Sequence, residues 1–298
     1  MRRTCSDGFT LIELVVALTL VSLLAMVAVP MLRLPMSAYL DAANRVELGA
    51  AAEVATARLA QDLGQALHNS VRVRQVGARV MLEYLELRAH GRYRNGASGA
   101  AQSCPAVCSA PGANDVLEFA CSEACFTSLG PLMGSAPVPG SDYVVINPRG
   151  PGVPGGDPYF GGAAVVAGGI KSRLLGVAPV AGGSRVTITP HSFALAAPSK
   201  RFYVVATPVS YECDPGTQRL TRYWGYPIAA TQPVVFAGAQ SAPLATQVSA
   251  CRIRYDTAGT GGRGGVVSVW LRFTRPAAGT GVAESFETFS EFAVSEAA

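Results

Sequence analysis

The sequence predicts an α+β fold in which one long N-terminal helix packs on an antiparallel, β-rich headpiece that carries a disulfide-stapled insertion. Residues 9–32 are apolar with a single charge, and an amphipathic helical pattern follows them. Farther along, apolar or alternating runs are separated by Gly- and Pro-rich stretches, as in strands joined by turns. We therefore divide the chain into a leader (1–8), a transmembrane helix (9–32), an amphipathic stalk helix (33–72) and a headpiece (73–298).

The apolar segment is long enough to cross a membrane. As a helix it would measure roughly 36 Å, at 1.5 Å per residue, against a hydrocarbon core of about 30 Å. Arg2 and Arg3 precede it, and positive charge there keeps the N-terminus in the cytoplasm. A conventional signal peptide, cut within Ala25–Ala28, is the alternative. We expect a single-pass precursor with its C-terminal side outside the cytoplasm.

Glu13 is the only charge in this segment, and three residues around it carry a resemblance. A charge near a bilayer core costs about 2.5–3.5 kcal/mol even on lenient scales, so Glu13 must lie near the headgroups or find a partner. Gly8 followed by Phe9, with Glu13 five residues into the remaining chain, resembles the N-terminus of type IV pilins and type II secretion pseudopilins. The resemblance implies that a prepilin peptidase cuts after Gly8 and methylates the Phe9 amine. It also implies that Glu13 meets that amine on a neighbouring subunit, which would favour lateral docking into a filament.

Pro30 stands at the twenty-second position of the chain that such a cut would leave, where this family often has a proline. Its ring removes one helical hydrogen bond. One interpretation is a kink that fits the headpiece onto a filament surface, and the other is simply the end of the membrane helix. We keep both and treat Pro30 as a candidate assembly residue.

The stalk prediction depends on an apolar stripe. Leu59, Leu63, Leu67 and Val71 recur at every fourth position with polar residues between them. We expect a helix through residue 72 whose stripe is buried under a sheet. His68 is expected to be a helix-terminal residue, not a ligand.

The middle of the chain predicts strands around an irregular insertion. One or two strands are expected within residues 77–94, with Glu83 and Glu86 on a solvated edge. Residues 95–162 are rich in Gly, Pro and Cys, and we interpret them as an insertion on the headpiece. Two strand-like pieces lie within it, at Asp115–Ala120 and Tyr143–Asn147.

The last part of the chain predicts most of the sheet. Seven segments have strand character, with Gly-rich or Pro-rich turns between them. In the run from Val266 to Phe273, apolar and polar residues alternate, and either face could be the buried one. The predicted strands are Arg185–Thr189, Ser192–Ala196, Arg201–Tyr211, Leu220–Tyr226, Ala250–Tyr255, Val266–Phe273 and Ser285–Phe292.

The cysteines predict disulfides outside the cytoplasm. Cys5 lies in the leader, and the remaining six form an even set. We predict a Cys213–Cys251 bond because these residues flank the C-terminal sheet core. The others, Cys104, Cys108, Cys121 and Cys125, form two C-x3-C pairs. Two disulfides of unknown pairing are favoured for them, and a four-thiolate zinc site is the alternative.

Charge and motifs argue against several function classes. The formal net charge of +4 is too small to indicate a nucleic-acid surface. The histidines, His68, His90 and His191, fall in no zinc-binding or hydrolase pattern. We therefore predict a non-enzymatic protein without cofactor or metal and without a nucleic-acid partner.

A second resemblance refines the expected role. Four segments are similar to the O-type minor pilin of the MSHA pilus. They are residues 201–213 (RFYVVATPVSYEC), 220–226 (LTRYWGY), 58–63 (RLAQDL) and 69–72 (NSVR). They are more loosely similar to the J-type pseudopilin and W-type minor pilin. The chain is also longer than a typical major pilin, which favours a subunit present in few copies.

These resemblances imply a minor, MSHA-like type IV pilin that primes or caps a filament. Its partners would be a prepilin peptidase, other minor and major pilins, and the inner-membrane assembly platform. The precursor would lie in the inner membrane, and the processed chain would reach the periplasm and the pilus at the cell surface. The alternatives are a minor pseudopilin at the tip of a type II secretion pseudopilus, or a tip adhesin.

Overall fold

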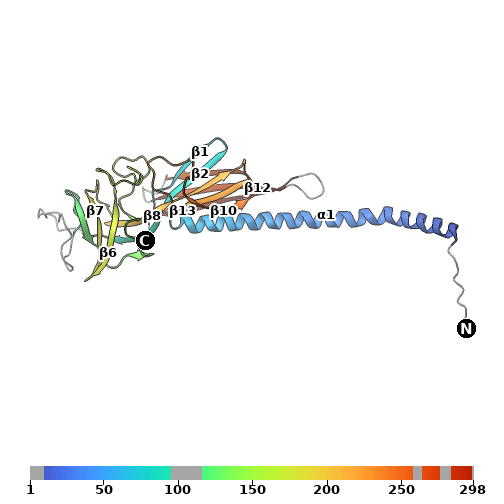
Figure 1. Cartoon of the computed structure of the whole chain (residues 1–298), viewed down its shortest axis with the longest axis horizontal. Helices are drawn as coiled ribbons and strands as arrows, with labels where there is room; N and C mark the ends of the chain where they lie inside the picture. The colour runs from blue at the N-terminus through green and yellow to red at the C-terminus, as the bar shows by residue number, and fades with distance from the viewer. Residues whose placement is uncertain (1–9, 95–115, 258–263, 276–282, 297–298) are drawn as a thin grey trace, which may run out of the picture. The chain divides into compact units, whose positions relative to one another are not determined.

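The computed structural model describes residues 10–94, 116–257, 264–275 and 283–296. The chain forms two compact units. The first comprises residues 1–50 and 274–286, and the second comprises residues 51–273 and 287–298. An N-terminal helix followed by an antiparallel, β-rich headpiece confirms the predicted fold class (Figure 1).

Helix α1 runs from Leu11 to Leu63. Within the second unit its apolar stripe is buried, with Ala52, Ala55, Leu59 and Leu63 each at most 2% exposed. Leu67 and Val71 continue the stripe and are equally buried, at 0% and 1%. The predicted burial of the stripe is therefore correct, although it does not all lie on a helix.

The predicted helix end at residue 72 is wrong. Gly64, a poor helix former, follows the last helical residue, and the backbone beyond it pairs with a strand instead. The amide of Leu67 donates to the carbonyl of Leu85 at 2.8 Å, and the amide of Leu87 donates to the carbonyl of Gln65 at 2.7 Å. The apolar residues at every fourth position correctly predicted burial of Leu67, but its backbone forms hydrogen bonds with the sheet and not within a helix.

The larger sheet has ten strands. Its main path follows the order β1-β2-β8-β5-β6-β7-β3, with β4 beside β2, β9 beside β8, and β10 beside β9. These neighbouring strands pair in antiparallel orientation. The strands are β1 (Arg72–Val76), β2 (Arg79–Arg92), β3 (Glu123–Thr127), β4 (Met133–Gly134), β5 (Tyr143–Ile146), β6 (Lys171–Val180), β7 (Gly183–His191), β8 (Arg201–Asp214), β9 (Arg219–Trp224) and β10 (Gln240–Thr246).

Strand β5 corrects the interpretation of residues 95–162 as an insertion. It pairs with β8 on one side and with β6 on the other. Both of its faces are buried, because Val144 and Ile146 pack in one apolar cluster while Tyr143 and Val145 pack in another. A strand buried on both faces is integral to the headpiece core.

The smaller sheet has three strands in the order β11-β12-β13. They are β11 (Val248–Asp256), β12 (Gly264–Arg275) and β13 (Glu284–Ser295). In β12 the face with Val267, Val269 and Leu271 is buried, and the face with Ser268, Trp270 and Arg272 is not. The structure thus decides which face of this alternating run is buried.

Six of the seven C-terminal strand predictions coincide with strands. Ser192–Ala196 is irregular, although Phe193 within it is buried in the core. The described part of Asp115–Ala120 is not a strand, and the nearby strand is β3. Strand β6 was not predicted because Gly176 and Pro179 interrupt its apolar pattern. Strands β1, β4 and β10 were not predicted either.

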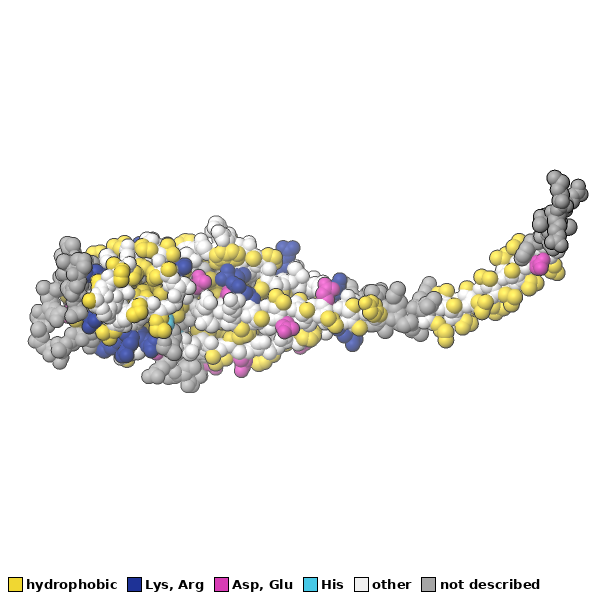
Figure 2. Space-filling view, turned by 90° about the horizontal axis from the view of Figure 1, so that it is seen from below, with side chains coloured by type: hydrophobic (Ala, Val, Ile, Leu, Met, Phe, Trp, Pro, Cys, Tyr) yellow, Lys and Arg dark blue, Asp and Glu magenta, His cyan; other side chains and the backbone are white. Residues whose placement is uncertain are grey.

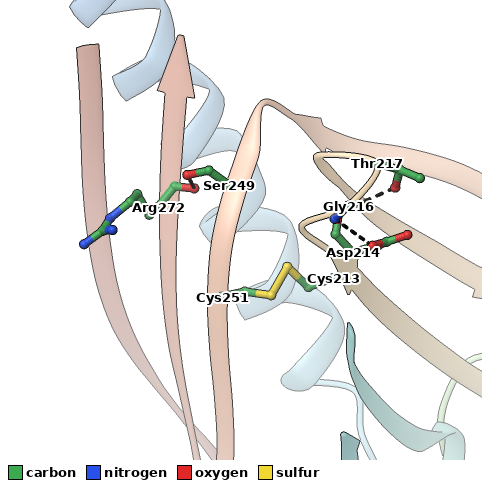
Figure 3. The surroundings of a disulfide bond; sticks show 7 residues. All are labelled: Cys213, Asp214, Gly216, Thr217, Ser249, Cys251 and Arg272. Carbon is green, nitrogen blue, oxygen red and sulfur yellow. Dashed lines mark hydrogen bonds between the residues drawn. A yellow bond between two sulfur atoms is a disulfide. The ribbon is translucent and has the colours of Figure 1, made fainter. Parts of the chain in front are cut away.

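One disulfide joins the two sheets. Cys213 on β8 and Cys251 on β11 are bonded, as predicted (Figure 3). Cys121 and Cys125 are also disulfide-bonded, as the favoured alternative predicts. Cys104 and Cys108 lie outside the described residues, and the pairing of the four clustered cysteines stays a prediction.

Candidate functional site: the N-terminal helix

The first part of α1 is apolar on every side. A candidate membrane span covers Leu11–Val29, with a mean hydropathy of 2.6, and none of it is buried within the chain. Leu11 and Met26, near its two ends, are 81% and 75% exposed. Figure 2 shows apolar side chains along the visible face of this part of the helix. A helix apolar all round requires an apolar environment from elsewhere, either lipid or other helices.

Glu13 lies in the first turn of α1 and bonds to Thr10. The Thr10 hydroxyl and amide donate to Glu13 Oε2 at 3.2 and 3.4 Å, and the Glu13 amide donates to Thr10 Oγ1 at 3.4 Å. This reciprocal arrangement is a capping box, which satisfies amides that the helix itself leaves without acceptors. Glu13 therefore has a role within its own chain in addition to the predicted one between chains.

Thr10 was not among the predicted site residues, although the sequence carried a signal for it. Thr-x-x-Glu directly before an apolar run is the pattern of a capping box. Gly8 and Phe9, the predicted processing residues, lie outside the described residues.

Two hydroxyl groups deeper in the span are satisfied within the helix. Thr19 Oγ1 donates to the carbonyl of Val16 at 2.9 Å, and Ser22 Oγ donates to the carbonyl of Leu18 at 2.7 Å. Such local bonds remove the cost of placing a hydroxyl in an apolar environment. Glu13 thus remains the single charged group of the span.

Pro30 lies inside the helix. Helical backbone continues past it and past Pro35 to Leu63. The candidate membrane span ends at Val29, directly before Pro30, so both interpretations of this residue stay open. Its assembly role stays a prediction.

Asp62 ties the last turn of α1 to the larger sheet. Its carboxylate accepts from Arg222 Nε at 2.5 Å, from the Tyr211 hydroxyl at 2.7 Å and from Arg58 Nε at 3.0 Å. The Asp62 side chain is 7% exposed and that of Arg222 is 15% exposed. A buried carboxylate with three donors fixes how this end of the helix lies on β8 and β9.

A second buried carboxylate corrects an expectation. Glu83 was predicted on a solvated edge, but its side chain is fully buried and paired with Arg72 at 2.5 Å. The hydroxyls of Tyr226 and Ser210 also donate to it, at 3.2 and 3.4 Å. Burial raises the pKa of the Glu83 carboxyl, and the nearby Arg72 opposes that rise. All its partners are side chains of the fold, so Glu83 is a structural group.

Comparison with known proteins bears on the N-terminal helix alone. Residues 3–29 match the sequence model of the prokaryotic N-terminal methylation motif. The chain carries that motif. No curated protein and no solved structure matches the chain.

The methylation motif supports a type IV pilin or pseudopilin, and hence a structural protein. It implies processing by a prepilin peptidase and assembly with other pilins. The motif also accounts for the exposed apolar helix, because the span Leu11–Val29 fits a membrane-anchored precursor. The motif covers the first turn of α1, where Thr10 and Glu13 bond to each other.

Proposed function

We propose that this chain is a minor, MSHA-like type IV pilin that primes or caps a pilus filament after cleavage at Gly8 and methylation of Phe9. One observation carries the proposal: a methylation motif opens a helix whose apolar span is wholly exposed and holds one carboxylate. The exposed span would first lie in the membrane and then among the helices of a filament. The large headpiece would remain outside the filament core.

In this proposal Glu13 acts between subunits. After cleavage, the new amine of Phe9 on one chain would meet the Glu13 carboxylate of its neighbour. In an apolar environment an unpaired carboxylate is costly and a paired one is tolerated, so the pair would favour docking of the helix. The prepilin peptidase, the other pilins and the inner-membrane assembly platform are the proposed partners. The processed chain would leave the inner membrane for the periplasm and the cell surface.

A filament count tests the role of the chain. We expect surface filaments, counted by electron microscopy, to disappear in cells that lack the chain and to return on complementation. Unchanged filament numbers together with lost exoprotein secretion would support the second candidate, a minor pseudopilin of a type II secretion system. The methylation motif is compatible with that candidate as well. Unchanged filaments and unchanged secretion would leave a tip adhesin, to be tested by attachment of cells to surfaces.

A further inference from the structure

The outward face of the smaller sheet carries an aromatic and basic groove. The groove has a volume of about 300 Å³ and is lined by Arg252 and Arg254 of β11, Ser268 and Trp270 of β12, and Phe289 of β13. Arg252 pairs with Trp270 across the strands, and Arg254 pairs with Ser268. The hollow lies over Ser268, because this small side chain stands among larger ones.

The walls of the groove are apolar rings. Phe289 is 62% exposed, although an aromatic side chain of that size is usually placed to bury its ring. Trp270 is half-buried, and its indole nitrogen donates to Glu287 Oε2 at 3.3 Å. The guanidinium of Arg272 lies 5.2 Å from the Trp270 ring centroid and is outside the groove lining. The indole is therefore held in place on one side while it borders the groove.

The charged residues that line the groove are both arginines. Neither Arg252 nor Arg254 forms an ion pair with a residue that the structure describes. The guanidinium of Arg252 lies 5.9 Å from the ring centroid of Trp270. In contrast, Arg272 on the same face is paired with Glu287 at 2.7 Å. Two free guanidinium groups beside a hollow favour a carboxylate, which they can bind through two parallel hydrogen bonds.

The opposite side of the groove offers acceptors. Glu291 of β13 accepts from the Ser268 hydroxyl at 3.1 Å, and Glu287 lies next to Trp270. A ligand with hydroxyl groups could donate to these exposed carboxylates.

We propose that this groove binds an acidic carbohydrate through a sugar residue that bears a carboxylate. The C–H faces of a sugar ring carry partial positive charge and would stack on the negative faces of Trp270 and Phe289. The sugar carboxylate would bind Arg254 and Arg252, and its hydroxyls would donate to Glu291. The volume is at the lower end of the range of small-molecule sites, roughly 300–1,000 Å³, which suits one or two sugar units.

A binding experiment with matched variants tests the proposal. Full-length, disulfide-intact protein in detergent is titrated by calorimetry with a galacturonic acid trimer, with a neutral galactose trimer and with a glutamate-rich peptide containing tyrosine. We expect binding of the acidic trimer only. Arg254→Gln should weaken it about tenfold or more, because a hydrogen bond to a charged group is lost. The control Arg219→Gln makes the same charge change at an exposed position of β9, outside the groove, and should leave binding unchanged.

Tryptophan fluorescence locates the contact independently. The chain has two tryptophans, Trp224 and Trp270. The acidic trimer should change the emission of the natural protein and of Trp224→Phe, but not that of Trp270→Phe. Three results would overturn the proposal: no binding of the acidic trimer, equal binding of the neutral trimer, or unchanged binding by Arg254→Gln. Preference for the peptide would instead assign the groove to a protein partner.

Discussion

Thr10 and Glu13 cap each other at the start of α1, with the Thr10 hydroxyl 3.2 Å from Glu13 Oε2 and the Glu13 amide 3.4 Å from Thr10 Oγ1. The carboxylate thus has two separable properties. As a hydrogen-bond acceptor it completes the first turn of its own helix, and as a charge it would attract the amine of a neighbouring chain. Substitutions can remove one property and keep the other.

Glu13→Gln should separate capping from charge. Glutamine also serves in a capping box, so the first turn should persist while the charge is lost. We expect membrane insertion to remain and incorporation into filaments to be nearly abolished. Glu13→Val, which removes both the charge and the cap, should be equally defective in incorporation. Sheared filaments analysed by immunoblotting, with membrane fractions as reference, measure both steps.

Thr10→Val is the complementary variant. It removes the hydroxyl from the capping box, at a cost of about 1 kcal/mol, and retains the charge of Glu13. We expect incorporation close to that of the natural chain. If Thr10→Val were as defective as Glu13→Val while Glu13→Gln assembled normally, Glu13 would act only as a cap and the proposed pairing would be wrong.

Asp62→Asn should loosen the end of α1 from the sheet. The substitution leaves Arg222 largely buried without its charged partner, and breaking a buried ion pair typically costs roughly 3–5 kcal/mol. We expect a lower denaturant midpoint for the headpiece in urea titrations of the full chain. The exposed residue Glu53 on the same helix supplies the control, because Glu53→Gln should change stability by less than about 0.5 kcal/mol. Equal denaturant midpoints for the two variants would argue against a role of Asp62 in holding the end of α1 on the sheet.

His68 should make the headpiece less stable in mild acid. Burial lowers its pKa to about 4, although the nearby Glu296 opposes this change, and its ring packs edge-on against Tyr203. The unfolded chain binds a proton near pH 6.5, and the folded chain does so only near pH 4. Stability contributed by the neutral form is therefore present above pH 6.5 and is lost as the pH falls toward 4.

The measurement compares urea unfolding at pH 7.5 and pH 4.5. His68 should contribute a loss of roughly 2–3 kcal/mol between these values. His68→Phe keeps a ring against Tyr203 and removes the titrating group. Between the two pH values the variant should therefore lose about 2–3 kcal/mol less free energy of unfolding than the natural chain. Because His68 also acts on the Glu296 carboxyl, the comparison is repeated in a Glu296→Gln background. Identical pH profiles would contradict the assignment.

The Cys213–Cys251 bond should stabilise the headpiece by linking its sheets. The two residues are 38 positions apart, and closing a loop of that length in the unfolded chain is worth about 4 kcal/mol in the chain-entropy description. We expect the Cys213→Ala, Cys251→Ala double variant to unfold at lower urea concentration. Reducing agent should have less effect on that variant than on the natural chain, since only the cysteines of the cluster remain to be reduced.

Local patterns predicted much of this fold, and distant pairings account for the rest. The stripe from Leu59 to Val71 was correctly predicted as buried, because its spacing records which side chains face the core. Its helix end was misplaced because Leu67 bonds to Leu85, a partner that no local pattern reveals. Strand β5 was placed in an insertion for the same reason, since its central position depends on β6 and β8.

The candidate site shows the same division. Glu13 could be recognised from the sequence because a lone charge in an apolar run needs an explanation, and Thr10 could have been recognised from its spacing to Glu13. The partners of Asp62 could not be recognised from the sequence, because Arg222 is 160 positions away. The groove over Ser268 depends on three strands meeting in register, which the alternating pattern of β12 does not specify by itself.

The pairing of β2 with β8 also determines when the headpiece can fold. Arg79 and Glu212, which bond across these strands, are 133 positions apart. A sheet with such long-range contacts forms slowly, and its central pair cannot exist until the chain has been made beyond Asp214. In a precursor anchored by its first helix, that helix would be in the membrane long before β2 and β8 pair. In the proposed precursor, export would therefore deliver the headpiece before its core is complete.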